Sequence, residues 1–574
     1  MGLDGFTLRA LVHELASALS DARLTKIHQP ARDEIVLILY HQRQDLRLVL
    51  SANPRWARLA LEAGGRDNPP TPPPFCMVLR KHLDGARLTS IAQDGLERIV
   101  TLTFSVRDEL GDLRRKRLLL EIMGRHSNLL LVDEQDTIID AIRRVADEEA
   151  ARPLVPGVRY LPPPRPDRPD ALCVDQARFA ELMHHPVAAA DALFTGLFGL
   201  SPLLAAEVCA RAGVPAQAIA DRLPPTNIAA LYDALNSLRD DSAGLCPEVV
   251  TTRSGKREFS AYALTQFRNA DRRRFSDVNS LIAAVLGGDE EQESLAAVRR
   301  SLTAIIRREV ERCERKLAAQ LEEARAGREA DELRLIGELI LANLGRLEKR
   351  MTEATLEDYA GNARTVKLNP SLTPSDNAQA YFRRYARAKK AAVAAAEHAR
   401  QSGEELAYLR QVALAIEQDG DAAALADIRA ELVMQGYIRP TAATVRGGQH
   451  RISAPRRFTS SDGREILVGR NNLQNDLVTM RLARPTDLWL HVKDLPGAHV
   501  ILRSGGGPIP DAAVELAAGL AAFYSSARAA AKVPVDCTER RHVRKVPGAR
   551  PGMVIYDHQK TIMAVPFAPS ESSD

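Results

Sequence analysis

The sequence predicts an α+β protein of several domains, and three features of the chain support this fold class. Helical and strand-like segments alternate over roughly the first 150 residues, as in a sheet covered by helices. Residues 295–430 carry the apolar spacing of long coiled-coil helices. Residues 455–565 again mix strand patterns, around 458, 466 and 488 and at 553–556, with a helix pattern over 511–530. At roughly 100–200 residues per domain, a chain of 574 residues can hold three to five domains.

In the N-terminal region, the first predicted element is a helix from Leu8 to Leu19, where apolar residues recur at helical spacing. Two alternating runs, at 34–40 and 46–50, predict paired strands. A proline cluster at 69–74 precedes a second helix over 75–83. Together with further predicted strands at 99–104, 117–122 and 129–132, these elements predict an α+β domain with a largely antiparallel sheet.

A linker and a helical region are predicted next. Residues 153–169 are rich in proline and arginine, which predicts an extended linker. Short helices rich in Ala and Leu follow over 175–240, and among them Gly196-Leu-Phe-Gly-Leu-Ser-Pro202 places glycines at a tight turn before a Ser-Pro helix start. This pattern predicts a helix-hairpin-helix, a motif that often contacts nucleic-acid backbones. Turns with glycine also join helices that have no such role.

A coiled-coil arm is predicted between residues 295 and 430. Apolar residues recur at spacings of three and four from Ile306 to Ala324 and, after a break near Gly327, from Leu333 to Met351. A polar tip at 361–375 separates this run from a second helical run that ends near residue 430. Two such helices should form an antiparallel pair, and fifty helical residues span roughly 75 Å. A compact helical bundle is the alternative.

Two polar segments of the C-terminal region are interpreted as a binding surface. Residues 487–491, Asp-Leu-Trp-Leu-His, alternate like a strand, and the Asn-rich segment 469–476 lies just upstream. Residues 450–560 contain seventeen Lys and Arg against ten Asp and Glu, a net charge of +7, whereas the whole chain carries +4. This excess favours a domain that binds a polyanion. A basic surface that is merely well solvated is the alternative.

Several classes of protein and site are disfavoured by the sequence. Six scattered cysteines without a Cys-x-x-Cys pair argue against a disulfide framework and a zinc ribbon. No signal peptide and no run of eighteen apolar residues is found, so a cytoplasmic protein without a membrane span is expected. The motifs of phosphate loops, dinucleotide sites, zinc proteases and serine hydrolases are missing. We therefore expect no metal site, no cofactor and no catalytic residues.

A set of short motifs follows a fixed order along essentially the whole chain. It comprises Leu3-Asp-Gly5, Lys26-Ile-His-Gln-Pro30, Asn53-Pro-Arg-Trp-Ala-Arg58, Pro74-Phe-Cys-Met-Val-Leu-Arg-Lys-His-Leu83, Glu121-Ile-Met-Gly-Arg-His-Ser-Asn128, Gly199-Leu-Ser-Pro202, Leu372-Thr-Pro-Ser-Asp-Asn-Ala-Gln-Ala-Tyr-Phe382, Gly469-Arg-Asn-Asn-Leu-Gln-Asn-Asp476, residues 487–500, Val533-Pro-Val-Asp536 and residues 547–556. In this order the motifs resemble the NFACT family, in particular its bacterial ribosome quality control factors.

The resemblance implies a domain organisation. Residues 1–170 would form an NFACT-N domain similar to the Fpg/Nei glycosylase fold, with the Pro-rich linker at its end. Residues 171–245 would form the helix-hairpin-helix domain, and 246–294 would return to pack on NFACT-N. The coiled-coil arm would occupy 295–440. An RNA-binding NFACT-R domain would follow over 455–566, with a disordered tail at 567–574.

The resemblance also implies a function. Family members bind large ribosomal subunits, and their rRNA, while these still carry peptidyl-tRNA. They recruit alanyl-tRNA, and the ribosome itself extends the nascent chain without mRNA, so the protein is not an enzyme. The resulting alanine tail marks the product for degradation. Two alternatives are a fibronectin-binding surface adhesin, suggested by older descriptions of the family, and a DNA-repair glycosylase, whose N-terminal catalytic Pro-Glu this chain lacks.

Candidate site residues follow from the matching motifs. The family's tRNA-binding pair is an Asp-Arg after Gly-Leu, and this chain has Glu97-Arg98 there, with the carboxylate one methylene further out. An intradomain ion pair worth ~0–1 kcal/mol is the alternative for this pair. Further tRNA-binding candidates are Asp4, Arg80, Lys81, His82, Glu121, Arg125 and His126. The candidates for RNA or ribosome binding in NFACT-R are Arg470, Asn471, Asn472, Asp487, Trp489, His491, Lys493 and Asp494. For Asp487 and Trp489 a role in holding the fold is the alternative.

Overall fold

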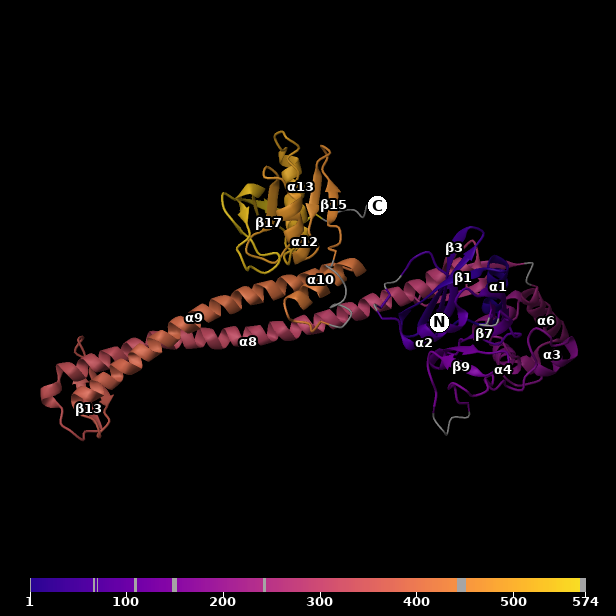
Figure 1. Ribbon diagram of the computed structural model, residues 1–574, viewed down its shortest axis with the longest axis horizontal. Helices are drawn as coiled ribbons and strands as arrows, with labels where there is room; N and C mark the ends of the chain where they lie inside the picture. The colour runs from indigo at the N-terminus through magenta and orange to yellow at the C-terminus, as the bar shows by residue number, and fades with distance from the viewer. Residues whose placement is uncertain are drawn as a thin grey trace. The chain divides into compact units, whose positions relative to one another are not determined.

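The computed structural model describes residues 2–65, 68–69, 71–107, 111–146, 152–240, 244–440 and 451–567, except the side chains of 328 and 329 (Figure 1). The chain divides into two compact units, Met1–Ser294 and Leu295–Asp574. Both contain helices and sheets, so the predicted mixed α+β multidomain class is confirmed. Among the residues described, no helix has the length and apolar character that crossing a membrane requires.

A nine-stranded antiparallel sheet forms the centre of the first unit. Its order is β4-β3-β2-β1-β5-β6-β7-β8-β9, so every neighbouring pair except β1 and β5 is also consecutive in the chain. Helix α1 packs against β5, and helix α2 packs against β1. The elements are α1 Gly5–Ala18, β1 Arg23–Ala31, β2 Glu34–His41, β3 Gln44–Ser51, β4 Arg58–Leu61, α2 Pro74–Leu83, β5 Arg87–Gln93, β6 Ile99–Arg107, β7 Leu113–Glu121, β8 Asn128–Val132 and β9 Ile138–Ala141.

Four short helices follow, and the predicted helix-hairpin-helix turn lies between the second and third. Ser201 caps α5 by accepting a hydrogen bond from the Leu204 amide at 3.2 Å, and Pro202 is the first residue of that helix. Gly199 in the turn has φ +86°, a conformation that residues with a Cβ rarely adopt. The helices are α3 Gln176–Leu182, α4 Ala189–Gly196, α5 Pro202–Arg211 and α6 Pro225–Arg239.

Two glycines hold Leu96 in a close contact that joins the hairpin to the sheet domain. A Cβ on Gly5 would lie 2.5 Å from the Leu96 carbonyl oxygen, and a Cβ on Gly199 would lie 2.3 Å from the Leu96 Cβ. Leu96 itself is 2% exposed. The start of α1, the segment around Leu96 and the hairpin turn therefore meet at one point, which only residues without side chains permit.

The chain then returns to the sheet domain. Strands β10 (Leu245–Thr251), β11 (Arg257–Tyr262) and β12 (Asp271–Arg274) form a separate antiparallel sheet that the sequence did not predict. Its Ala261 amide donates to the Thr7 hydroxyl of α1 at 3.3 Å. Helix α7 (Val278–Ile282) begins where the Val278 amide donates to Glu14 at 2.9 Å.

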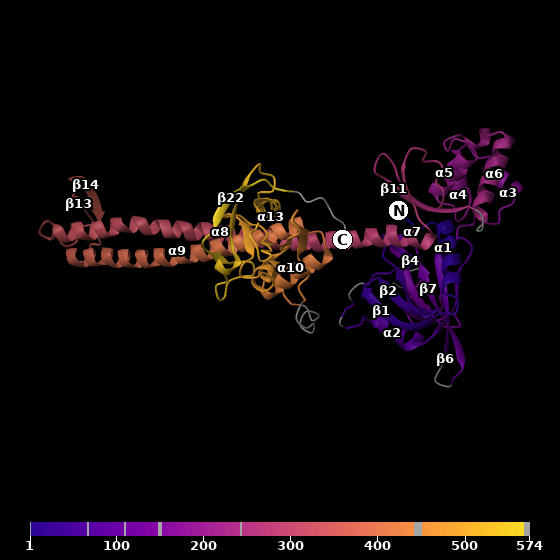
Figure 2. The same cartoon turned by 90° about the horizontal axis from the view of Figure 1, so that it is seen from above.

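The arm in the second unit is an antiparallel helix pair, as predicted, and α8 and α9 lie side by side in both views (Figures 1 and 2). Cys313 lies against the Ser402 carbonyl, with 3.3 Å between sulfur and oxygen, and Gly337 lies against the ring of Phe382. Residue numbers rise along α8 while those of the contacting residues fall along α9, so the two helices run antiparallel. Helix α8 continues through Gly327, where the apolar stripe is interrupted, and the missing side chain there lets α8 pack closely against Ala392 of α9. The helices are α8 Gly288–Ala342 and α9 Pro374–Gln418.

Two features of the arm differ from the sequence expectation. Its tip contains a β-hairpin, β13 (Glu353–Glu357) and β14 (Ala363–Lys367), where the sequence indicated only a polar segment. The second helical run is two helices, because α9 ends at Gln418 and α10 (Ala422–Met434) begins after a new cap. That cap is Asp421, whose side chain accepts from the Ala423 amide at 3.1 Å.

The C-terminal domain is a six-stranded antiparallel sheet with the order β15-β16-β18-β17-β19-β22. Helix α13 packs on one face, and helix α12 with the π-helical turn at 477–482 covers the other. Side chains alternate between two apolar clusters, so that Leu490 faces α13 while Trp489 faces the opposite side. The elements are β15 Arg456–Thr459, β16 Glu465–Val468, α12 Asn472–Asp476, β17 Leu488–Val492, β18 Val500–Leu502, α13 Asp511–Phe523, β19 Val533–Glu539, β20 Val543–Arg544, β21 Ile555–Tyr556 and β22 Lys560–Ala564.

Most, but not all, of the predicted C-terminal elements are present. Strands expected around 458, 466 and 488 are confirmed as β15, β16 and β17. The helix expected over 511–530 ends earlier, at Phe523, and the strand expected over 553–556 contains only its last two residues. Strands β19 and β22 were not predicted.

The contact at Leu96 generates the first prediction. Gly199→Ala adds a Cβ that clashes with Leu96 at a positive φ, so it should lower the free energy of unfolding by about 1–3 kcal/mol or more. The matched control is Gly213→Ala, where φ is +69° and no atom lies within 4 Å of the added Cβ, so only about 1 kcal/mol of backbone strain is expected. Urea unfolding of the full chain measures both, and equal effects would contradict the close contact.

Candidate nucleic-acid interfaces

Three predicted tRNA-binding residues line one cavity of about 580 Å³ in the first unit. Asp4 precedes α1, while Glu97 and Arg98 directly follow the buried Leu96. The Pro-rich segment and the helix hairpin supply the opposite walls, with Pro163, Pro164, Pro166, Arg168, Phe194, Phe198 and Ser201. The glycine contact at Leu96 therefore brings Glu97 and Ser201 close to Asp4, from which they are roughly one hundred and two hundred positions away in the sequence.

The cavity presents a cation beside two carboxyl groups. Asp4 caps α1, accepting from the Thr7 amide at 2.8 Å and the Thr7 hydroxyl at 3.1 Å, and burial raises its pKa. Burial also raises the pKa of Glu97, which Arg165 and Arg98 lower in part. The Arg98 side chain is exposed. An exposed guanidinium at a hollow surface can form two hydrogen bonds with one phosphate.

Arg165, which the sequence reading did not single out, connects the linker to this cavity. Its Nη2 pairs with Asp170 Oδ2 at 2.6 Å, and its Nε lies 4.0 Å from Glu97 Oε1. Its guanidinium also stacks over the ring of Phe198, 4.1 Å from the centroid. The proline and arginine content of the linker was the only sequence signal. Arg165 thus fastens the linker to the hairpin and gives Glu97 a cationic neighbour.

The candidates on α2 do not line the cavity. Arg80 donates from Nε and Nη2 to the Ile27 carbonyl at 2.9 and 2.7 Å, which ties α2 to β1. His82 Nδ1 lies 2.7 Å from Lys116 Nζ, and burial followed by Lys116 and Lys81 lowers the pKa of His82. Lys81 is exposed. This part of α2 offers a lysine to solvent, while Arg80 holds the fold.

The three remaining tRNA-binding candidates of the first unit also comprise one residue that holds the fold and two that are exposed. Glu121 is completely buried, and both of its oxygens already accept hydrogen bonds, from Arg152 and, at 2.9 Å, from the Tyr160 hydroxyl, so it has no unpaired oxygen to offer RNA. Arg125 and His126 are exposed on the turn that follows Met123, a residue of the cavity wall. The expectation of a direct contact is therefore wrong for Glu121, while Arg125 and His126 remain predictions.

The Asn-rich segment is not a surface, which corrects the interpretation from sequence. Asn471 and Asn472 are 2% and 1% exposed, because they form a polar interface between α10 and the C-terminal domain. The Asn471 amide donates to Asp427 at 3.3 Å, and the Asn472 amide donates to Glu431 at 2.9 Å. Arg470 is partly buried and pairs with Asp419 and, at 2.7 Å, with Asp421. Buried polar groups need partners, and these side chains supply them to the helix carboxylates.

Asp487 also holds the fold. It is 1% exposed and accepts from the amides of Arg484 and Ser504, at 2.8 and 3.0 Å, and from Arg503 at 2.9 Å. These donors hold its pKa below the ordinary value although burial opposes them. Lys493 and Asp494 are exposed in the turn after β17, where Asp494 has φ +54°.

Trp489 and His491 line a second cavity, of about 530 Å³, between α9 and the C-terminal domain. Asp494, His499 and Tyr556 share its wall with them, and Ala407, Tyr408, Arg410 and Gln411 contribute from α9. Gln411 holds α9 against the C-terminal domain, because its amide donates to the Gly497 carbonyl and its oxygen accepts from the Gly497 amide at 2.8 Å. A cavity lined by aromatic rings is thus present where the sequence predicted a polar surface.

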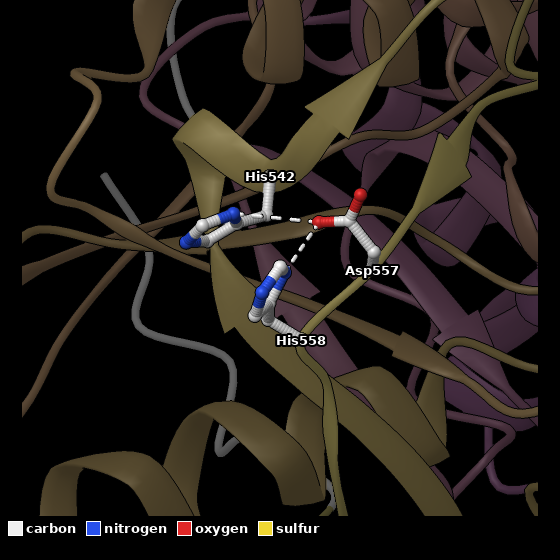
Figure 3. Close-up of side chains that lie close together, drawn as sticks. All are labelled: His542, Asp557 and His558. Atoms are coloured by element: carbon white, nitrogen blue, oxygen red, sulfur yellow. Dashed lines mark hydrogen bonds and ion pairs between the residues drawn. The ribbon is translucent and has the colours of Figure 1, made fainter.

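A basic edge formed by residues 540–544 and 557–560 contains β20 of the two-stranded β20–β21 sheet and reaches the start of β22, an outer strand of the six-stranded sheet. Two histidines, His542 and His558, point toward the carboxylate of Asp557, at 3.4 and 2.7 Å (Figure 3). Arg544 contacts the other oxygen of Asp557 at 2.7 Å, and Arg541 is exposed beside it. Two imidazoles and a carboxylate could hold a metal ion, but a guanidinium on that carboxylate opposes added positive charge. The cluster is better suited to binding anions, and the run of basic residues at 540–545 was its sequence signal.

Comparisons with known proteins fit this arrangement. The NFACT N-terminal and middle domains match residues 4–447. The chain belongs to the NFACT family. The RNA binding domain of NFACT proteins matches residues 455–557, which contain both the aromatic cavity wall and most of the basic edge.

Individual relatives extend the similarity over the whole chain. A protein of Bacillus subtilis named Rqc2 homolog RqcH is 34% identical over 582 residues, covering 99% of this NFACT chain and 98% of its own length. Among solved structures, the fibrinogen binding protein from Staphylococcus aureus covers 49% of this chain and 98% of its own, with 29% identity and a TM-score of 0.42. The MutM (Fpg) protein from Thermus thermophilus covers 41% of this chain and 74% of its own, with 15% identity and a TM-score of 0.20.

The polar interface on α10 should make the stability of this NFACT chain depend on pH. Burial raises the pKa of Glu431 from an ordinary 4.5 to about 7, and its partners are Tyr408 and Asn472. Because the folded pKa is the higher one, the contribution of Glu431 to stability is complete below pH 4.5 and is lost as the pH rises through about 7. Glu431→Gln keeps an acceptor for both partners and should add up to about 3 kcal/mol above that pH.

Urea unfolding of both proteins at about pH 5 and about pH 8 measures this effect. The decline in stability with pH should be smaller in Glu431→Gln than in the unmodified chain. Glu417→Gln, which changes an exposed glutamate of α9, is the matched control and should leave the decline unchanged. A Glu431→Gln protein with an unaltered decline would show that this carboxyl is not the titrating group.

Proposed function

We propose that this NFACT protein is a ribosome quality control factor. It binds large ribosomal subunits that are obstructed by peptidyl-tRNA, and it recruits alanyl-tRNA for alanine tailing without mRNA. The observation that carries the proposal is the cavity where Asp4, Glu97 and the exposed Arg98 meet, in a chain that is similar over its whole length to Rqc2 homologs. The alanine tail then marks the stalled chain for degradation.

The tRNA contact is assigned to the first cavity. Arg98 offers a guanidinium to a tRNA phosphate, and the two carboxyl groups can accept hydrogen bonds from ribose hydroxyls or base amines. Glu97 reaches one methylene further than the aspartate of the family's motif, and Arg165 holds it against the linker. The chain therefore positions a tRNA, and peptide-bond formation is left to the ribosome, so the protein is not an enzyme.

Contact with the large subunit and its rRNA is assigned to the arm and the basic edge. At 1.5 Å per residue, the 55 residues of α8 extend roughly 80 Å. Exposed cations gather at the arm tip, at Arg346, Lys349, Arg350 and Lys367. Such cations bind phosphates without reading sequence, which suits a partner recognised mainly by shape. All of these interactions belong to the cytoplasm.

Arg98→Ala should abolish co-purification of tRNA while binding to large subunits persists, since the arm and the basic edge remain. Arg115→Ala is the matched control, because Arg115 is an exposed arginine of β7, the strand next to the one that follows Arg98, and it does not line the cavity. Sequencing of RNA bound to the full chain, together with sedimentation with large subunits, measures both. Loss of tRNA and subunits together would assign Arg98 a structural role, and no tRNA enrichment in the unmodified protein would exclude the function.

Arg541→Ala with Arg544→Ala should weaken binding of single-stranded RNA and flatten its dependence on salt. Each lost phosphate contact reduces the slope of log affinity against log salt by about 0.7. The control pair is Arg451→Ala with Arg457→Ala. Arg451 precedes β15 and Arg457 lies within it, on the opposite edge of the six-stranded sheet. Fluorescence anisotropy with a labelled oligonucleotide measures the slopes. Equal slopes in the two double variants would contradict a phosphate-binding role for the basic edge.

A further inference from the structure

The aromatic cavity of the C-terminal domain has the features of a ligand site. Its volume of about 530 Å³ lies within the range of roughly 300–1,000 Å³ that is usual for small-ligand cavities. Tyr556 and Trp489 have ring centroids 4.7 Å apart, and His491 lies 5.7 Å from Trp489 and nearly parallel to it, at 18°. His491 and Tyr556 are partly exposed and can stack against a flat molecule, while the buried Trp489, tilted 48° from Tyr556, packs behind them.

The two histidines that line the cavity, His491 and His499, are uncharged. Burial lowers the pKa of His491 to about 4 and moves that of His499 in the same direction, so both rings are neutral near pH 7. His499 is fixed by a contact of 2.8 Å between Nδ1 and the Thr479 hydroxyl. A neutral imidazole offers one donor and one acceptor, and it does not attract a free anion into the cavity.

Two buried polar atoms in the cavity wall have no hydrogen-bond partner among the described residues. The indole Nε1 of Trp489, on a side chain that is 0% exposed, is a donor, and the Oδ1 of Asn472 is an acceptor. A buried polar group without a partner costs about 1–3 kcal/mol, so a ligand that supplies both partners would be favoured. The required ligand is flat and aromatic, with a donor and an acceptor on its edge.

We propose that this cavity binds one unstacked nucleobase of a single-stranded RNA segment. The inference rests on the proposed function, because it deepens the RNA-binding role of the domain. A nucleobase combines a π-face with donors and acceptors along one edge. The exposed Lys493 and the rim residue Arg410 can meet the adjoining phosphates, and the basic edge begins one residue after Tyr556. A free nucleotide shares this chemistry, and the experiment separates the two sources.

Trp489 provides a direct test in the full-length chain. The chain has two tryptophans, so Trp56→Phe leaves Trp489 as the only indole fluorophore. In this background a short single-stranded RNA should quench the fluorescence of Trp489, whereas an abasic oligonucleotide of the same length should not. Binding of both to the full chain is followed by anisotropy of a label on each oligonucleotide. The abasic one should bind roughly five- to a hundredfold more weakly, the contribution expected of one stacked base.

A matched pair of variants tests whether the cavity is the site. Ala407 lines the cavity from the exposed side of α9, so Ala407→Leu places three more carbons there without altering the RNA-binding domain. Ala413→Leu makes the same change at an exposed position of α9 outside the cavity. Quenching should be lost in Ala407→Leu and kept in Ala413→Leu. Trp489→Phe, followed by anisotropy alone, should weaken binding to RNA because it removes the unpaired donor.

The outcomes separate this inference from the proposed function. RNA that binds without quenching Trp489, and with equal affinity in both alanine variants, overturns the base site but leaves RNA binding intact. An absence of RNA binding by anisotropy contradicts the proposed function itself. Adenosine monophosphate is the second probe, and quenching by this nucleotide alone, with none by the oligonucleotide, would make the cavity a nucleotide site and overturn the assignment to RNA.

Discussion

The second unit depends on a buried interface in which carboxylates of α10 meet amides of the C-terminal domain. Asp427 and Glu431 are four residues apart and face the same way, and both are almost completely buried. An unpaired carboxylate at such a position would be costly, and the amides of Asn471, Asn472 and Gln474 offset part of that cost. The interface fixes the domain against the arm, and together with the contact between Gln411 and Gly497 it holds the two walls of the aromatic cavity facing each other.

A similar constraint acts in the first unit, but there it is steric. Leu96 occupies space that side chains at Gly5 and Gly199 would need, and the residues after Leu96 are thereby held opposite the helix hairpin. Both candidate sites thus lie at junctions of segments that are distant in sequence. The first site depends on how closely the backbones at Gly5, Leu96 and Gly199 can approach, whereas the second depends on hydrogen bonds between side chains of α10 and the C-terminal domain.

The sequence predicts elements better than it predicts junctions. Regular spacing of apolar residues is a local signal, so the arm and most strands could be found from it. For Asn471 and Asn472 the sequence predicts the wrong environment, because polar residues buried between two domains and polar residues on a surface have the same composition. Their partners, Asp427 and Glu431, lie some forty residues upstream, and their spacing of four on an alanine-rich helix was the available signal. Motif resemblance located Arg98, but it could not show that Glu121 of the same set is buried.

The net charge of the C-terminal domain overstates what is available to RNA. Arg470 and Arg503 are committed to Asp419 and Asp487, and Arg540 donates to the Thr479 carbonyl at 2.6 Å. These arginines stabilise the fold and cannot release counterions when RNA binds. Ten Lys and Arg among residues 451–567 remain exposed, but only Arg541, Arg544 and Lys560 of them lie on the basic edge, so phosphate contacts at that edge alone should give modest affinity. A stacked base in the aromatic cavity, as proposed above, would add binding energy that salt does not screen.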